Sequence, residues 1–189
     1  MLGSTGSVGR STLDVVSRCD NISIFALSAF RNSELLLSQC LQHEPKYAVL
    51  GDLEQHKRFK RLLAVSSCKT EFLDTEDALE FIAVHEQVDM VMAAIVGAAG
   101  LSSGLAAVSA GKCLLLANKE SLIMSGKLFI DAAKRNNADI IPIDSEHNAI
   151  FQCLAETRSR LPSSDGRFVD KLVLTASGGP FLNTPKKAL

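Results

Sequence analysis

The chain has 189 residues, of which 47% are hydrophobic and 22% charged, and its net charge is −1. This composition is typical of a globular protein with room for one domain and part of a second. The near-zero charge argues against a basic binding surface, so we expect neither nucleic acid nor an anionic membrane as a partner. The longest apolar stretch, residues 88–101, contains charge and glycine and is too short to span a bilayer.

The cysteines indicate a reducing compartment. Their number is odd, they are widely spaced and no two form a C-x-x-C pair; they are Cys19, Cys40, Cys68, Cys113 and Cys153. This pattern is typical of reduced thiols in small core positions of a cytosolic protein. We therefore expect a bacterial cytoplasmic protein. A plastid origin stays open, because a sequence that has lost its start would also have lost a transit segment.

Short apolar runs alternate with amphipathic runs along the whole sequence. The predicted strands are residues 22–27, 47–50, 69–72, 88–92, 113–116, 140–143 and 171–174. The predicted helices are residues 7–18, 33–43, 53–64, 75–85, 101–110, 121–136 and 146–157. This alternation predicts an α/β fold with a doubly wound parallel sheet through residue 143. Residues 144–189 would begin a second, incomplete α/β domain.

A glycine-rich segment, G-S-T-G-S-V-G, opens the sequence and leads into the first predicted helix. Gly3, Gly6 and Gly9 would let the chain turn tightly and bring backbone N–H groups and the helix N-terminus to a phosphate. Within a β-α-β pattern, this spacing predicts a Rossmann-like dinucleotide-binding domain. Glycines at this spacing also occur in plain turns. Only two residues precede Gly3 where a strand is needed, so we expect the sequence to lack its true beginning.

The end of the next predicted strand indicates which dinucleotide would bind. An NAD enzyme places an acid there for the ribose 2′-hydroxyl, but this segment reads S-A-F-R-N and its first acid is Glu34. Arg31 would instead favour the 2′-phosphate of NADP, because guanidinium matches phosphate geometry. The alternative is that Arg31 is an ordinary solvated loop residue.

Two further segments follow predicted strands at the edge where ligands of such sheets bind. The small residues of A-A-I-V-G-A-A-G-L, residues 93–101, allow a flat ring to approach closely, or else simply allow tight helix packing. The segment L-A-N-K-E-S, residues 116–121, combines an amide, an ammonium group and a carboxylate. A Lys–Glu pair at a helix start is as often structural as functional.

Asp144 and Glu146 form the most specific candidate site. Alternate residues of an extended segment point to the same side, so these two carboxylates would share a face and suit Mg²⁺ or Mn²⁺. Two carboxylates are too few, so substrate oxygens, water or a further carboxylate would complete the site. Ser145 could alternatively cap the following helix, with Glu146 in its first turn. His147 points to the other side and is interpreted as structural.

The last candidate segment is T-A-S-G-G-P-F, residues 175–181, which follows a predicted strand. Its hydroxyl and backbone N–H groups could form a small phosphate-binding nest. It could equally be a turn that ends the strand.

Taken in order, five motifs resemble the 1-deoxy-D-xylulose 5-phosphate reductoisomerase family. They are G-S-T-G-S-V-G, A-A-I-V-G-A-A-G-L, L-A-N-K-E-S-L, P-I-D-S-E-H-N-A-I-F-Q and T-A-S-G-G-P-F, and the resemblance covers nearly all of the sequence. It implies an NADPH-dependent oxidoreductase that needs Mg²⁺ or Mn²⁺. Such an enzyme isomerises and reduces 1-deoxy-D-xylulose 5-phosphate, a small sugar phosphate, to 2-C-methyl-D-erythritol 4-phosphate in isoprenoid biosynthesis.

The resemblance also implies a role for each matching residue. The residues that would hold NADPH are Thr5, Gly6, Ser7 and Val8 at the pyrophosphate, Arg31 and Asn32 at the adenosine phosphate, and Asn118 and Glu120 beside the nicotinamide. The metal ligands would be Asp144 and Glu146. The substrate contacts would be Lys119, Ser145, Glu146 and Ser177, of which Lys119 and Glu146 would be catalytic.

Departures from the family pattern set the remaining expectations. Phe30-Arg31-Asn32 stands where the family usually has Gly-Lys-Asn, which puts the backbone approach to the adenosine in doubt. Family members are much longer and contain a third metal carboxylate, a substrate flap and a helical C-terminal domain. We therefore expect a chain truncated at both ends, inactive alone, from a homodimeric parent. The alternatives are a non-catalytic NADP-binding module, or an oxidoreductase of amino-acid semialdehydes, against which D-S-E argues.

Overall fold

The computed structural model describes residues 1–160, 170–173, 183–185 and 187, and only the backbone of residues 155–160. The chain divides into two compact units, Met1–Asp144 and Ser145–Leu189. The first unit contains all of the strands among the described residues. The second begins with helix α7, Ser145–Arg160. The predicted division into an NADP-binding domain, residues 1–143, and a catalytic domain, residues 144–189, stays a prediction.

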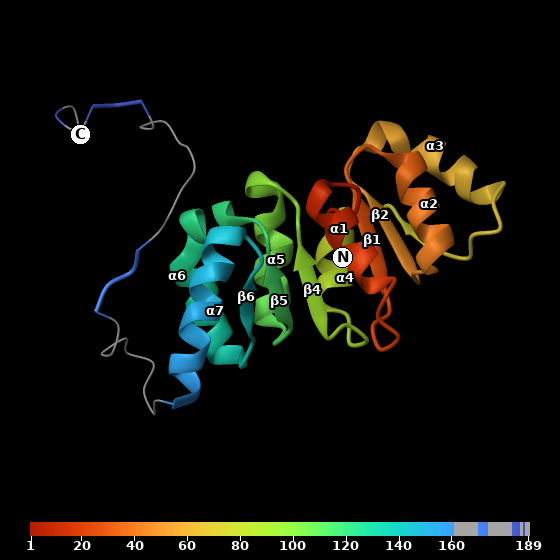
Figure 1. Cartoon of the computed structure of the whole chain (residues 1–189). Helices are drawn as coiled ribbons and strands as arrows, with labels where there is room; N and C mark the ends of the chain where they lie inside the picture. The colour runs from red at the N-terminus through yellow and green to blue at the C-terminus, as the bar shows by residue number, and fades with distance from the viewer. Residues whose placement is uncertain (161–169, 174–182, 186, 188–189) are drawn as a thin grey trace. The chain divides into compact units, whose positions relative to one another are not determined.

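The first unit alternates strands and helices, as the sequence predicts (Figure 1). Its strands are β1 Ala26–Ala29, β2 Tyr47–Leu50, β3 Glu71–Leu73, β4 Met90–Ala93, β5 Cys113–Leu116 and β6 Ile140–Pro142. Its helices are α1 Ser7–Val16, α2 Ser33–His43, α3 Leu53–Ala64, α4 Ala78–Val84, the 3-10 helix η1 Gly97–Gly100, α5 Leu101–Ser109 and α6 Lys119–Asn136. No helix among the described residues has the length and apolar character that crossing a membrane requires.

The strands form two parallel sheets, ordered β1-β2-β3 and β4-β5-β6, and Met1 and Leu2 lie between β1 and β4. Leu2 donates its N–H to the carbonyl of Met92, while the carbonyl of Met1 accepts from the N–H of Ser28. The two residues therefore pair on both sides, and the order across the unit is β3-β2-β1, residues 1–2, β4-β5-β6. The predicted doubly wound parallel arrangement is confirmed.

Two apolar clusters form the core, and the first of them extends from β4 and β5 to Ala26 of β1 and Val49 of β2. The cluster around β4 and β5 includes Leu2, Val91, Val108, Leu114 and Phe129, all buried. The cluster around β1 and β2 includes Leu13, Leu27, Leu36, Leu50 and Phe59, also buried. Since burial of a large apolar side chain stabilises a fold by about 1.5–3 kcal/mol, these contacts are what hold the loops at the strand ends in place.

Most predicted elements are present, and the bounds of several strands and helices differ from the predicted ones by one to four residues. Residues 47–50 and 113–116 are strands and residues 33–43 and 53–64 are helices with the predicted bounds. The strand predicted at 22–27 instead covers Ala26–Ala29, because its ladder with β2 begins where Ala26 pairs with Tyr47. For the predicted strand 171–174, the structure shows no strand at 171–173, and residue 174 lies outside the described residues.

Candidate functional site

The glycine loop, residues 3–9, turns the chain sharply between Leu2 and helix α1. Gly3 has φ +83°, and a Cβ there would lie 2.7 Å from the carbonyl oxygen of Ala94. A Cβ on Gly9 would lie 2.4 Å from the carbonyl oxygen of Gly3. Real Cβ contacts are never this short, so only glycine fits at either position. The loop therefore packs directly against the chain that leaves β4.

Buried hydrogen bonds that the sequence did not reveal hold this loop in place. The Ser4 hydroxyl donates to Gln39 Oε1 at 2.7 Å, and Gln39 Nε2 donates back to the Ser4 carbonyl at 2.9 Å. Gly3 N–H donates to the Ser28 hydroxyl at 3.0 Å. Because Gln39 lies 35 residues from Ser4, no local pattern signals this contact.

The start of helix α1 is open to solvent and carries no acid. Gly6 occupies the N-cap position without a side-chain cap, and Ser7 and Val8 are exposed in the first turn. A Cβ on Gly6 would meet only the Gly3 carbonyl oxygen, at 3.5 Å, which is ordinary contact. The free N–H groups and the positive helix end therefore form an arrangement suited to an anion such as a pyrophosphate.

Arg31 lies just after β1 and is paired with an acid from the next strand end. Its Nε donates to Asp52 Oδ2 at 2.9 Å, and its guanidinium lies 5.1 Å from the centre of the Phe30 ring. The side chain of Arg31 is 72% exposed, and that of Asp52 only 13%. Asn32 caps helix α2 by accepting from the N–H of Leu35 at 3.1 Å. The sequence pattern does not indicate Asp52 as a partner of Arg31, because the two residues lie 21 positions apart.

Asn118, directly after β5, holds the loop that follows β4. Its Nδ2 donates to the carbonyl oxygens of Ile95 at 2.7 Å and Gly97 at 2.8 Å. A Cβ on Gly100 would lie only 3.1 Å from that same nitrogen, so the close approach of Asn118 favours a glycine at this position of residues 93–101. The buried Oδ1 of Asn118 has no hydrogen-bond partner within the described part of the chain. A buried acceptor of this kind is costly unless a ligand or water satisfies it.

Lys119, at the start of α6, forms an ion pair with Asp144, the second residue after β6. Lys119 Nζ lies 3.1 Å from Asp144 Oδ2, and the Asp144 side chain is largely shielded, at 14% exposure. Glu120, next to Lys119, is exposed in the first turn of α6. The carboxylate of Asp144 is thus kept near a cation and oriented by it.

The remaining predicted residues belong to the second unit. Ser145 and Glu146 are both exposed and open helix α7, and the Ser145 hydroxyl donates to Glu146 Oε2 at 2.9 Å. Ser177 lies outside the described residues, as does the whole of residues 175–181. Within the described residues no group of three or more His, Cys, Asp or Glu side chains is placed to hold a metal ion.

The candidate residues of the first unit lie at one edge of the sheet. The glycine loop follows residues 1–2, Arg31 follows β1, Asn118 follows β5 and Asp144 follows β6, so all lie at the carboxyl ends of parallel strands. Ligands of open α/β sheets bind at this edge. The glycine cradle, the open helix end and the unsatisfied Asn118 oxygen fit a dinucleotide. The carboxylate of Asp144 has the chemistry that a hard divalent cation prefers.

Two family profiles match the chain. One is 1-deoxy-D-xylulose 5-phosphate reductoisomerase, over residues 1–126, and the other is the C-terminal domain of that enzyme, over residues 140–189. The chain is 54% identical over 186 residues to the reductoisomerase of Saccharophagus degradans and 53% identical over 188 residues to that of Tolumonas auensis. These alignments cover 98% and 97% of this chain and 47% of each relative. The chain thus spans about half the length of these relatives.

Solved structures of the same enzyme share the fold. The Zymomonas mobilis enzyme in complex with NADPH matches with a TM-score of 0.85 and 42% identity, covering 97% of this chain and 46% of that chain. A DOX-P reductoisomerase in complex with magnesium matches with a TM-score of 0.86 and 44% identity, covering 98% and 47%. The resemblance seen in the five motifs is confirmed: the chain belongs to the 1-deoxy-D-xylulose 5-phosphate reductoisomerase family.

Proposed function

We propose that this chain provides the cofactor-binding part and some of the active site of an NADPH-dependent reductoisomerase. The reaction is the isomerisation and reduction of 1-deoxy-D-xylulose 5-phosphate to 2-C-methyl-D-erythritol 4-phosphate, a step of isoprenoid biosynthesis. One observation carries the proposal: the glycine loop, Asn118 and the Lys119–Asp144 pair all lie at the carboxyl edge of the sheet. Relatives of the chain are named for this reaction, and a solved relative binds NADPH.

The cofactor would lie across this edge with its pyrophosphate at the start of α1. There Thr5, Ser7 and Val8 offer backbone N–H groups, which bind phosphate oxygens at no cost in side-chain entropy. Gly6, whose own N–H donates to the Gly3 carbonyl at 3.3 Å, would let the phosphate approach the backbone closely. Arg31 and Asn32 would bind the adenosine phosphate, for which Arg31 would exchange its bond to Asp52 for one to the phosphate.

The nicotinamide end would lie near Asn118 and Glu120. The Asn118 amide nitrogen is fully used by Ile95 and Gly97, which leaves Oδ1 as the atom that could accept from the cofactor. The small residues after β4 allow the ring to lie close to the backbone, which orients one face of it toward the substrate.

The substrate end would be formed by Lys119, Asp144, Ser145, Glu146 and Ser177. Asp144 and Glu146 would hold a divalent cation, and Lys119 would keep Asp144 oriented and contact the substrate. When bound, NADPH supplies the hydride and the cation polarises a carbonyl oxygen. Lys119 and Glu146 would position the sugar phosphate, with Ser145 holding the Glu146 carboxylate through its hydroxyl.

The cofactor assignment is tested by NADPH fluorescence titration of the chain and two alanine variants. Gly6→Ala places a methyl group where the pyrophosphate would bind, while Gly126→Ala places one in ordinary contact with Leu122 Cβ, at 4.0 Å. We expect at least a tenfold loss of NADPH affinity for Gly6→Ala, no change for Gly126→Ala, and similar melting temperatures for both. Equal affinity in the two variants would refute the pyrophosphate assignment.

We also propose that the chain alone binds NADPH without turning over substrate. The chain covers 47% of each relative that is named for the reaction, and a non-catalytic NADP-binding module is the alternative. The rate of NADPH oxidation with sugar phosphate and Mn²⁺ tests the first statement: any turnover would overturn it. Mn²⁺ binding that depends on Asp144 would favour the enzyme over the module.

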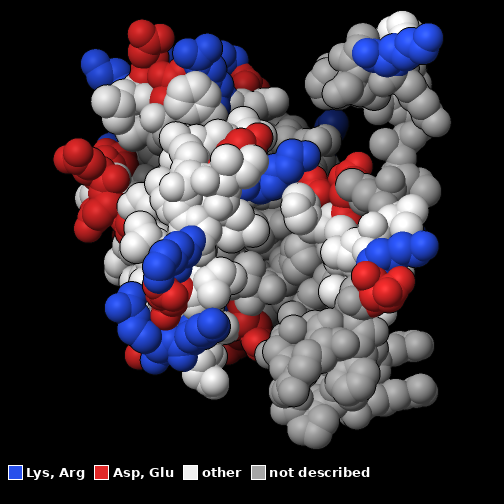
Figure 2. Space-filling view, turned by 90° about the vertical axis from the view of Figure 1, so that its left-hand side faces the viewer, with Lys and Arg blue, Asp and Glu red and all other residues white. Residues whose placement is uncertain are grey.

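We propose, finally, that the parent protein is a homodimer in the bacterial cytoplasm and acts only on small molecules. Acidic and basic side chains are intermixed over the face shown in Figure 2, which offers no extended basic surface for nucleic acid there. The relatives named above are bacterial. Sedimentation of the full-length protein would test the dimer, and a filter-binding assay with duplex DNA would test the lack of affinity for nucleic acid.

A further inference from the structure

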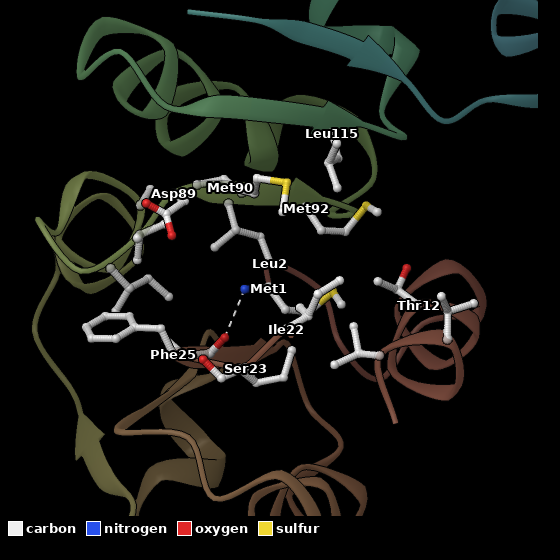
Figure 3. Close-up of a pocket in the computed structure, with 18 of the residues that line it drawn as sticks. Met1, Leu2, Thr12, Ile22, Ser23, Phe25, Asp89, Met90, Met92 and Leu115 are labelled. Atoms are coloured by element: carbon white, nitrogen blue, oxygen red, sulfur yellow. Dashed lines mark hydrogen bonds between the residues drawn. The ribbon is translucent and has the colours of Figure 1, made fainter. Parts of the chain in front are cut away.

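The cavities of the first unit differ in the chemistry of the side chains that line them. The larger, of about 1110 Å³, lies between β1 and β4, and Leu2, Ile22 and Met92 are among its apolar lining residues (Figure 3). No cysteine is among the described residues that line it. A smaller cavity of about 330 Å³, between the end of α2 and the loop before β3, is lined by both Cys40 and Cys68. The smaller cavity therefore brings two nucleophilic side chains together.

Cys40 and Cys68 are in contact although they lie far apart in the sequence. Cys40 belongs to the last turn of α2 and is fully buried in the apolar cluster around β1 and β2. Cys68 is partly buried and packs against the same cluster. The two side chains are within hydrogen-bonding contact, and both thiols are free. The fold thus holds a pair of reduced sulfur atoms side by side.

The loop that carries Cys68 is anchored on both sides of this residue. The Ser66 hydroxyl donates to the Leu63 carbonyl at 2.8 Å and accepts from the Cys68 N–H at 3.2 Å. On the other side, the buried Thr70 hydroxyl donates to the Pro45 carbonyl at 2.8 Å. These bonds hold the backbone of the loop beside the end of α2. The contact between the two cysteines is therefore fixed by the backbone on either side of it.

The two thiols differ in how an oxidant can reach them. Burial and the neighbouring Cys68 sulfur raise the pKa of Cys40 to about 12, so Cys40 stays protonated at neutral pH. Cys68 is partly exposed, lines the cavity and is followed by Lys69, which also lines it. Oxidation of a cysteine requires solvent access to its sulfur. Cys68 is therefore the thiol that an oxidant meets first, and Cys40 is the thiol placed behind it.

We propose that Cys40 and Cys68 are a redox-active pair, which a hydroperoxide converts into a disulfide bond. The bond joins the end of α2 to the loop before β3. It fastens the helix that also carries Gln39, the partner of Ser4 in the glycine loop. This inference goes beyond the proposed function and does not depend on it, because it rests on the two thiols and the cavity between them.

The reaction with hydrogen peroxide proceeds in two steps. The Cys68 thiolate attacks one peroxide oxygen, so that an S–O bond forms and the O–O bond breaks. The leaving hydroxide takes up the proton that Cys68 has lost, which gives water and a sulfenic acid. The Cys40 sulfur then attacks the Cys68 sulfur, an S–S bond forms, and the S–O bond breaks. The departing hydroxide leaves as a second water with the Cys40 proton, so two thiols lose two electrons and the peroxide gains them.

The experiment treats the folded chain with hydrogen peroxide in dilute solution and counts the remaining thiols with a thiol-reactive dye in denaturant. We expect the count to fall from five to three and dithiothreitol to restore it. Mass spectrometry of a non-reduced digest should show one peptide pair that contains Cys40 and Cys68, lighter by two hydrogen atoms than the separate peptides. This mapping needs no variant and so does not depend on how a substitution folds.

A pair of variants and a melting curve test the location. Cys68→Ser should retain its four other thiols under the same treatment. Cys113→Ser, which removes a partly buried cysteine at the start of β5, should still lose two. The bond closes a loop of about 30 residues, so the oxidised chain should melt about 5 °C or more above the reduced chain. Cys68→Ser should show no such rise.

Three results would overturn the proposal. The first is a digest in which the disulfide joins other cysteines or two copies of the chain. The second is conversion of Cys68 to a sulfinic acid while Cys40 stays a free thiol, because the two sulfur atoms would then be unable to meet. The third is a Cys40–Cys68 bond that leaves the melting temperature unchanged or lowers it, which would show that the bond forms in unfolded chains rather than in the fold.

Discussion

Lys119 and Asp144 form an ion pair that links the end of β5 to the end of β6, with Nζ 3.1 Å from Oδ2. The pair leaves Asp144 largely shielded and Lys119 half exposed. A carboxylate held in this way is restricted in its rotamers, and a restricted ligand loses less entropy when it binds a cation. Lys119 therefore links the end of β5, where the cofactor is proposed to bind, to Asp144, the proposed metal ligand.

Replacing Asp144 by asparagine should weaken Mn²⁺ binding at least tenfold, because the amide keeps the shape but loses the charge that attracts a hard cation. Mn²⁺ binding to the chain is measured by electron paramagnetic resonance of the free ion. The matched control is Asp131→Asn, which breaks a similar pair, with Lys127 Nζ 2.7 Å from Asp131 Oδ2. Equal Mn²⁺ affinity of the two variants would remove Asp144 from the metal site.

Arg31 should decide between NADPH and NADH. Arg31→Gln removes a charge-assisted contact, so NADPH affinity should fall about tenfold while NADH affinity stays unchanged. Asp52→Asn should act in the opposite direction and strengthen NADPH binding a few-fold, because it removes the anion that holds the guanidinium. Fluorescence titration with each nucleotide measures both effects.

The control for this pair is Arg18→Gln, since Arg18 also pairs with an acid and has a side chain 74% exposed. Its NADPH affinity should equal that of the unchanged chain. If Arg31→Gln weakens NADPH and NADH to the same degree, Arg31 does not contact the 2′-phosphate.

Gln39 should be needed for the rigidity of the glycine loop. Gln39→Leu leaves the Ser4 hydroxyl and carbonyl without their buried partners, which should cost about 1–3 kcal/mol of the free energy of unfolding. Gln42→Leu, at an exposed position of the same helix, is the control and should change it by less than about 0.5 kcal/mol. Urea unfolding measures both. A loss as small for Gln39→Leu as for Gln42→Leu would show that the loop holds without these bonds.

Elements with strong local signals were predicted best. Helices α2 and α3 match their predicted bounds because Asn32 and Asp52 accept from first-turn N–H groups and mark where the helices begin. The strands at 47–50 and 113–116 are apolar runs between turns, and each pairs with a parallel strand on both sides. Local chemistry and tertiary contacts agree at these elements.

Contacts between distant residues could not be predicted in the same way. Asp52 reaches Arg31, and Gln39 reaches Ser4, only because β1 lies next to β2 and next to residues 1–2. Residues 22–25 read as a strand by composition, yet the strand begins at Ala26, because strand formation requires a partner at the same level. The glycines were found by spacing, whereas the reasons for Gly3 and Gly9 lie in the backbone that packs against them.

The buried amino group of Met1 should make stability depend on pH. Burial lowers its pKa from 8.0 to about 5, so between these values the unfolded chain binds a proton that the folded chain does not. The free energy of unfolding should therefore rise with pH from about 5 to 8 and fall as pH is lowered through that range. Burial also lowers the pKa of His43, which adds a contribution of the same sign near the usual histidine range.

Acetylation of the Met1 amine separates these two contributions. The acetylated nitrogen keeps one N–H for the Ala26 carbonyl and no longer takes up a proton. Urea unfolding of the acetylated chain should show a flatter pH dependence between 7 and 8, where the contribution of His43 is small, and should retain the part due to His43 at lower pH. An unchanged slope between 7 and 8 would show that the amine is solvated in the folded chain.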